Sequence, residues 1–82
     1  MKMAVKDLVA ERFAEICSKR GIKPNELATL SGVTPSTVYS MLDMRRRNIS
    51  ITTIKLLCDG LGITLGEFFS TPEFDALEQE MK

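Results

Sequence analysis

The sequence contains no histidine and no tryptophan, and only two of its 82 residues are cysteine. Without histidine it lacks the ligand spacing of a zinc site. Two cysteines are also too few for the disulfide framework of a small secreted protein. Cys17 and Cys58 both fall on apolar helical faces, where a thiol acts as a small buried hydrophobe. We therefore expect no metal, no cofactor and no disulfide framework.

Long apolar runs are missing as well. The first apolar segment is interrupted by Lys6, Asp7, Glu11 and Arg12, so we interpret it as neither a signal peptide nor a membrane span. No cofactor-binding loop and no nucleophile–base pair is recognisable, and a domain this small has little room for a substrate pocket. We expect a cytoplasmic protein that is not an enzyme and does not contact a membrane.

The charges are balanced overall but divided unevenly between the two halves of the chain. Residues 1–49 contain nine Lys and Arg against five Asp and Glu, whereas residues 50–82 contain two against six. A random division of surface charge would also give such a difference. A basic half beside an acidic half nevertheless suggests one surface that faces phosphate and another that faces away from it.

The first helix is predicted over residues 4–20. Apolar side chains recur there at three- and four-residue steps, which is typical of one buried stripe. Gly21 follows the basic last turn, where a left-handed residue would end the helix. The expected inward residues are Val5, Leu8, Val9, Phe13, Ile16 and Cys17.

Two short helices should follow. Pro24 suits the first position of one, because its missing N–H would have no partner there, and Gly32 should end it. Thr34 and Pro35 suit the N-cap and first position of the next, over residues 35–42. The expected inward residues are Leu27, Ala28 and Leu30 in the first helix and Val38, Met41 and Leu42 in the second.

These two helices form a helix-turn-helix pattern over NELATLSGVTPSTVYSML, residues 25–42. In such a motif the second helix lies in the major groove and presents its N-terminal residues to base edges. The pattern leaves small polar side chains and one tyrosine on the outer side of that helix. These are Ser36, Thr37, Tyr39 and Ser40.

Three further helical segments are expected in the C-terminal half. Ser50 should cap a helix over residues 51–61, and Thr64 with Glu67 should form a capping box for a short helix that carries Phe68 and Phe69. A sixth segment should begin at Pro72 and cover residues 73–81. The expected inward residues of the fourth helix are Ile51, Ile54, Leu57, Cys58 and Leu61.

With these residues in place, the chain resembles the phage repressor and Cro type of helix-turn-helix domain, the xenobiotic-response-element (XRE) family. The resemblance covers about residues 9–69, through KRGIKPNELATLSGVTPSTVYSML and NISITTIKLLCDGLGITLGEFF. It implies an all-α fold, a five-helix bundle of the lambda-repressor-like DNA-binding type, here with an additional C-terminal helical segment. We accordingly divide the chain into a DNA-binding domain, residues 1–70, and an acidic helical tail, residues 71–82.

The resemblance also implies which residues contact DNA. The first, second and sixth residues of the third helix would face bases, and two others would lie at the sugar–phosphate wall. Ser and Thr specify bases weakly, so part of the sequence reading would come from DNA shape. The three successive arginines after the helix would contact phosphates. The candidate site residues are Pro35, Ser36, Thr37, Tyr39, Ser40, Arg45, Arg46 and Arg47.

This chain departs from the family pattern at several positions. Pro24 stands where a glutamine often contacts phosphate. Cys17 and Leu42 stand where relatives often have an arginine and a glutamate that form a partly buried ion pair. Replacing both partners by apolar groups can be neutral, whereas losing one is costly. We therefore predict that Cys17 and Leu42 touch.

The resemblance favours a transcriptional regulator, a repressor, that binds a double-stranded DNA operator as a homodimer. One alternative is an antitoxin of a toxin–antitoxin pair, which would bind a protein partner through the acidic C-terminal segment. Another is a protein-interaction module of the same fold that has lost DNA binding. Phe74, Leu77 and Met81 lie on one side of that segment, and they would either pack on their own bundle or form a dimer surface.

Overall fold

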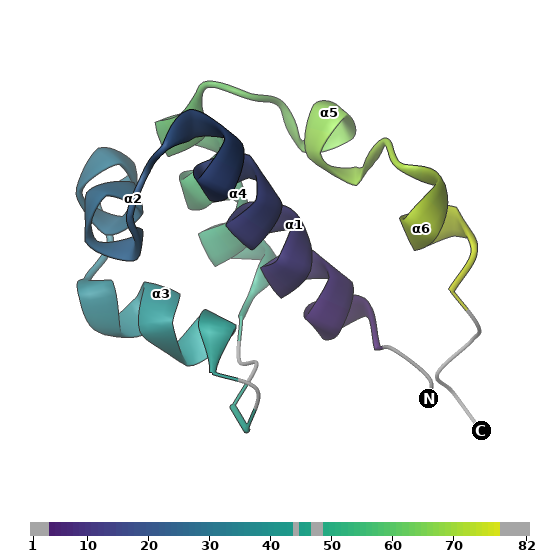
Figure 1. Cartoon of the computed structure of the whole chain (residues 1–82), viewed down its shortest axis with the longest axis horizontal. Coiled ribbons are helices and arrows are strands. Elements are labelled where there is room, and N and C mark those ends of the chain that lie inside the picture. Colours follow the sequence, from purple (N-terminus) through teal and green to yellow (C-terminus); the bar gives the residue numbers. More distant parts are fainter. Residues whose placement is uncertain (1–3, 44, 47–48, 78–82) are drawn as a thin grey trace.

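Six helices follow one another along the chain in the structure, a computed structural model that describes residues 4–43, 45–46 and 49–77. They are α1 (Val5–Arg20), α2 (Pro24–Ser31), α3 (Pro35–Leu42), α4 (Ile51–Leu61), α5 (Leu65–Phe69) and α6 (Pro72–Asp75). Helix α1 runs through the middle of the molecule in Figure 1, with α2 and α3 on one side and α5 and α6 on the other. No helix of the described residues is long and apolar enough to cross a membrane.

The helix starts and ends follow the local chemistry of the sequence. Ser50 accepts a hydrogen bond from the Thr53 N–H at 3.1 Å and so caps α4. Thr64 and Glu67 form the expected capping box of α5: the Thr64 N–H donates to the Glu67 carboxylate and the Glu67 N–H to the Thr64 hydroxyl, with nitrogen-to-oxygen distances of 2.8 and 3.0 Å. Helices α1, α2 and α4 each end at a glycine with positive φ. The predicted all-helical order is therefore confirmed.

One hydrophobic core joins the first five helices. Its largest fully buried side chains include Phe13 of α1, Leu27 of α2, Met41 of α3, Leu57 of α4 and Phe68 of α5. The whole buried cluster consists of Val9, Ala10, Phe13, Ile16, Cys17, Leu27, Ala28, Val38, Met41, Ile54, Leu57, Cys58, Leu61 and Phe68.

Three residues that the periodicity assigned to the core are instead exposed: Val5, Leu30 and Ile51. Leu30 is 55% exposed because Ser31, one residue on, occupies the face that α2 turns toward α4. Val5 and Ile51 are the first residues of their helices. The apolar stripe reaches these positions, but no neighbouring helix among the described residues covers them.

Helices α2 and α4 cross closely at Ser31 and Gly60. A Cβ atom placed on Gly60 would lie only 2.9 Å from the Ser31 Cα and N atoms, and nearer still to its hydroxyl. Real Cβ atoms do not approach backbone so closely. The crossing therefore depends on the absence of a side chain at Gly60, and it sets how α2 lies on the rest of the bundle.

Arg12 ties α1 to the end of α5. Its Nε donates to the Phe68 carbonyl at 2.9 Å and its Nη2 to the Glu67 carbonyl at 3.2 Å, so it binds two carbonyls of the short helix. The guanidinium carbon also lies 5.9 Å from the centroid of the Phe68 ring. A positive group is well placed there because helix C-termini carry partial negative charge.

We expect Arg12→Met to lower the free energy of unfolding by about 2 kcal/mol, because charged hydrogen bonds to two carbonyls are lost while the apolar stem is kept. Urea unfolding followed by circular dichroism measures this change. Lys19→Met is the control, since the Lys19 side chain is 72% exposed and forms a surface ion pair with Glu15, which contributes less than about 1 kcal/mol. Equal losses in the two variants would contradict the role given to Arg12.

Helix α6 is shorter than predicted. The sequence indicated a helix over residues 73–81, but α6 ends at Asp75 and Leu77 is no longer helical. Residues 78–82, which include Met81, lie outside the described part of the chain. The Phe74 ring packs on its own bundle, with its centroid 4.8 Å from that of Phe69 and 6.0 Å from that of Phe68. For Phe74, packing on its own chain is therefore the arrangement that the structure shows.

Candidate nucleic-acid interface

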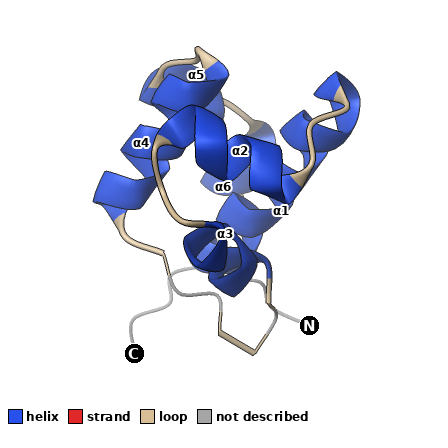
Figure 2. Ribbon diagram, turned by 90° about the vertical axis from the view of Figure 1, so that its left-hand side faces the viewer, coloured by secondary structure: helices blue, strands red, loops and turns tan. Residues whose placement is uncertain are grey.

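The turn between α2 and α3 is fixed by backbone hydrogen bonds around Gly32. Gly32 has φ of 70°, its N–H donates to the Thr29 carbonyl at 3.3 Å, and the Val33 N–H donates to the Ala28 carbonyl at 3.1 Å. This left-handed glycine, followed by an apolar residue that packs on the core, makes a rigid helix end. The predicted helix-turn-helix geometry is thus present, and it holds α3 at a fixed angle to α2 (Figure 2).

Helix α3 has a buried face and an open face. Val38 and Met41 are fully buried and anchor the helix to the core. The predicted contact residues lie on the other side, where Pro35, Ser36 and Tyr39 are exposed. Because the open face carries mainly small side chains, the helix backbone could come close to the floor of a DNA groove.

Two of the predicted contact residues are only partly exposed and already have intramolecular partners. The Thr37 hydroxyl lies 3.1 Å from that of Thr34, at the N-cap position of α3. The Ser40 hydroxyl lies 3.4 Å from Nη1 of Arg46. Both hydroxyls therefore have an intramolecular partner before any ligand binds.

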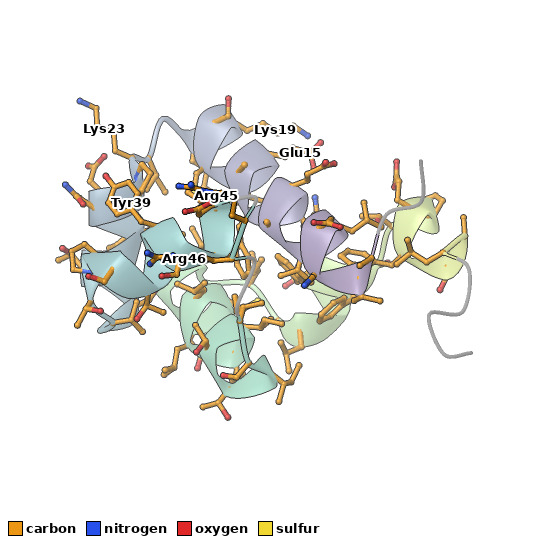
Figure 3. All side chains as sticks on the ribbon, turned by 90° about the horizontal axis from the view of Figure 1, so that it is seen from below. Glu15, Lys19, Lys23, Tyr39, Arg45 and Arg46 are labelled. Atoms are coloured by element: carbon orange, nitrogen blue, oxygen red, sulfur yellow. The ribbon has the colours of Figure 1, made fainter. Side chains whose placement is uncertain are left out.

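The arginine loop follows α3 directly, and its side chains return toward the helix. Arg45 and Arg46 have side chains that are 91% and 69% exposed. Figure 3 shows them beside Tyr39 in the view from below, which looks onto α3 and this loop. Arg47, the third arginine of the prediction, lies outside the described residues.

Asp43 holds both described arginines. Its carboxylate lies 3.6 Å from Arg45 Nε and 3.9 Å from Arg46 Nε, and Oδ1 also accepts the Arg45 N–H at 2.9 Å. The sequence interpretation missed this residue, although an acid two and three positions before two arginines is a readable signal. Asp43 places a negative charge within the cluster that was predicted to face phosphate.

Cys17 and Leu42, which were predicted to touch, line the same apolar hollow between α1 and α3. The prediction that Cys17 and Leu42 lie on the facing sides of α1 and α3 is therefore correct. Their direct contact stays a prediction. Burial raises the pKa of the Cys17 thiol, and nearby Arg20 opposes this effect in part.

Comparison with known proteins identifies this arrangement. The family model described as the Cro/C1-type HTH DNA-binding domain matches residues 12–73, which include most of the core, the turn, α3 and the arginine loop. The chain belongs to this family. The predicted resemblance is confirmed, and so is the all-α fold of the lambda-repressor-like type.

Two curated relatives of this Cro/C1-type domain carry the name "HTH-type transcriptional regulator PuuR", from Escherichia coli (strain K12) and Shigella flexneri. Each is 35% identical over 63 residues, which cover 77% of this chain but 34% of the relative. The chain thus spans about a third of the length of these relatives.

A solved structure matches the Cro/C1-type domain along nearly its whole length. The crystal structure of the prophage Lp1 protein 11 superposes with a TM-score of 0.80 at 34% sequence identity, covering 94% of this chain and 100% of that one. The match extends well beyond the helix-turn-helix, so the whole bundle is shared and not the motif alone.

Proposed function

We propose that this Cro/C1-type domain is a sequence-specific, double-stranded DNA-binding transcriptional regulator that inserts α3 into the major groove. The observation that carries the proposal is the open face of α3, which is anchored from behind by Val38 and Met41 and flanked by two exposed arginines. A helix that enters a groove needs a rigid base, a small-residue face and phosphate contacts at its margin. The family membership and the similarity to named transcriptional regulators support the same function.

Within this proposal the side chains divide by their place on α3. Pro35, Ser36 and Ser40 would meet base edges, where a serine hydroxyl can donate or accept. Thr37 and Tyr39 would contact the sugar–phosphate wall. The three arginines after the helix would contact phosphates, which position the protein without reading sequence. These are Arg45, Arg46 and Arg47.

The proposal includes repression of transcription in the cytoplasm by a homodimer. A two-fold dimer would present its two α3 helices about 34 Å apart, which matches half-sites separated by one turn of DNA. Bound over a promoter, such a dimer would exclude other proteins from that stretch of duplex. Repression by this route needs no further catalytic or cofactor-binding group.

Selection from a pool of random duplexes at about 150 mM salt, followed by sequencing, tests the proposal. A dimeric regulator should enrich a palindrome whose half-sites lie about ten base pairs apart. Enrichment of one short half-site would keep DNA binding and remove the dimer. No enrichment by the folded protein would contradict the proposed function and favour a protein-interaction module.

We expect Asp43→Asn to tighten binding to duplexes of arbitrary sequence, because it removes a carboxylate that lies 3.6 and 3.9 Å from Arg45 and Arg46 Nε. At low salt, affinity should rise about three- to tenfold, and the log–log salt slope should steepen by about one to two units, since each phosphate neutralised adds nearly one. Fluorescence anisotropy across a salt series measures both quantities.

Asp59→Asn is the matched control for Asp43→Asn. It changes the net charge equally, but Asp59 pairs with Lys55 on the exposed side of α4. We expect it to leave the salt slope unchanged. An equal effect of the two substitutions would mean that overall charge, and not release of the arginines, controls the affinity.

A further inference from the structure

A hollow of about 230 Å³ lies behind α3, where this helix meets α1 and α2. Its floor consists of Phe13, Leu27, Val38 and Met41, which are all buried to 1% exposure or less. Among the residues that the structure describes, none of the side chains that line it is charged. The proposed DNA contacts lie on the opposite face of α3, so this hollow has no part in them.

The rim of the hollow is also largely apolar. Cys17, Ile22 and Leu42 line it and are buried or half-buried, while Ser18 and Ala14 are exposed at the mouth. The Cys17 pKa is raised by burial, so this thiol is protonated and neutral at neutral pH. The hydroxyl of Ser18 is thus the principal hydrogen-bonding group at the rim.

We propose that this hollow is a binding site for a small uncharged aromatic molecule of one or two rings, with at most one hydrogen-bonding group that faces Ser18. The size fits, because an enclosed cavity of about 150 Å³ lined by apolar side chains takes up benzene. The charge fits as well, because a charged ligand would lose its hydration and find no counter-ion among the lining side chains.

Binding would remove apolar surface of both the ligand and the rim from water. Ligand pockets in proteins have this pattern, with an apolar lining and a few polar groups that set the orientation. Val38, Met41 and Leu42 all belong to α3, so a bound molecule would lie directly against the base of that helix. The site goes beyond the proposed function, and its occupancy is measured without DNA.

Titration of the isotopically labelled full chain with indole, followed by NMR, tests the site. Indole has two fused rings and a single N–H donor. We expect saturable binding with Kd of about 1 mM or tighter, as ligands of this size allow. The largest shifts should occur in the methyl groups of Leu27, Val38 and Leu42. Shifts that do not saturate, or that are as large at exposed Leu30 and Ile51, would overturn the proposal.

Two variants close the hollow in different ways. Cys17→Met fills it from the rim with a flexible apolar side chain, and Ala14→Leu covers its mouth from an exposed position where folding is not at risk. Each should weaken indole binding at least tenfold. Leu30→Met, on the exposed side of α2 and outside the hollow, should leave Kd unchanged. Unchanged Kd in Ala14→Leu would overturn the proposal even if Cys17→Met failed to fold.

Discussion

Ser36→Glu should reduce affinity for the selected operator at least 100-fold while the fold is kept. Ser36 is exposed at the second position of α3, on the face proposed to enter the groove. A carboxylate there would lie among base-edge acceptors and phosphates, and unfavourable charge contacts in an interface cost several kcal/mol. The helix itself would not suffer, because acidic residues in a first turn favour the helix dipole. Fluorescence anisotropy with the operator duplex measures the loss.

Gly66→Glu is the matched control for this substitution. It introduces the same side chain at the same position of a helix, the second residue of α5, and a Cβ there meets nothing closer than 3.8 Å. Helix α5 lies at the far end of the molecule from α3 in both ribbon views (Figures 1 and 2). We expect it to lower operator affinity less than about threefold, through net charge alone. Comparable losses in the two variants would contradict the assignment of α3 as the DNA-reading helix.

Gly60→Ala should strongly destabilise the protein. The added Cβ would lie 2.9 Å from backbone atoms of Ser31, so α2 and α4 would have to separate. Overpacking a well-packed core costs about 1–3 kcal/mol, and we expect a cost of about 3 kcal/mol because backbone atoms cannot move aside as a side chain can. In a domain of this size that corresponds to a fall in Tm of about 12–24 °C. Calorimetry or thermal circular dichroism measures the change.

The same substitution at Gly66 separates this clash from the general effect of replacing glycine in a helix. A Cβ at Gly66 has only the Thr64 hydroxyl near it, at 3.8 Å. Alanine is favoured over glycine in helices by up to about 1 kcal/mol, so Gly66→Ala should be neutral or stabilising. If Gly60→Ala behaved in the same way, helices α2 and α4 would not be as close as the structure shows.

The local features of the fold could be predicted from the sequence because they depend on neighbouring residues. The capping box of Thr64 and Glu67, the cap at Ser50 and the left-handed end at Gly32 each involve groups within a few positions of one another. Such chemistry is readable from spacing alone.

The features that the sequence did not reveal depend on how the helices pack. Periodicity placed Leu30 inward. In the structure Ser31 faces Gly60 of α4 instead, and Leu30 is left on the exposed side of α2. The ends of α1 and α4 were misjudged because periodicity does not show where a neighbouring helix stops. The same holds for the apolar hollow, which arises from side chains of three helices.

The candidate site was predicted in part. Ser36 and Tyr39 lie on the open face as expected, because the buried positions Val38 and Met41 determine the remaining orientation of α3. Asp43 was not predicted, because only the positive charges of the arginine loop were considered and not the carboxylate that pairs with Arg45 and Arg46. The DNA contacts of these residues stay predictions.

The pairing of Asp43 with two arginines bears on how such a protein would search a genome. Every phosphate contact made at an arbitrary sequence lengthens the stay at a wrong site, because that part of the affinity is electrostatic and independent of sequence. A carboxylate that lies within 4 Å of both arginine side chains competes with phosphate for them at every position along the duplex. At the operator, contacts from α3 add to the affinity and compensate for that competition. Asp43 would therefore shorten residence at every site by a similar factor and so speed the search, while the contacts of α3 set the ratio of operator binding to arbitrary binding that governs occupancy in a cell.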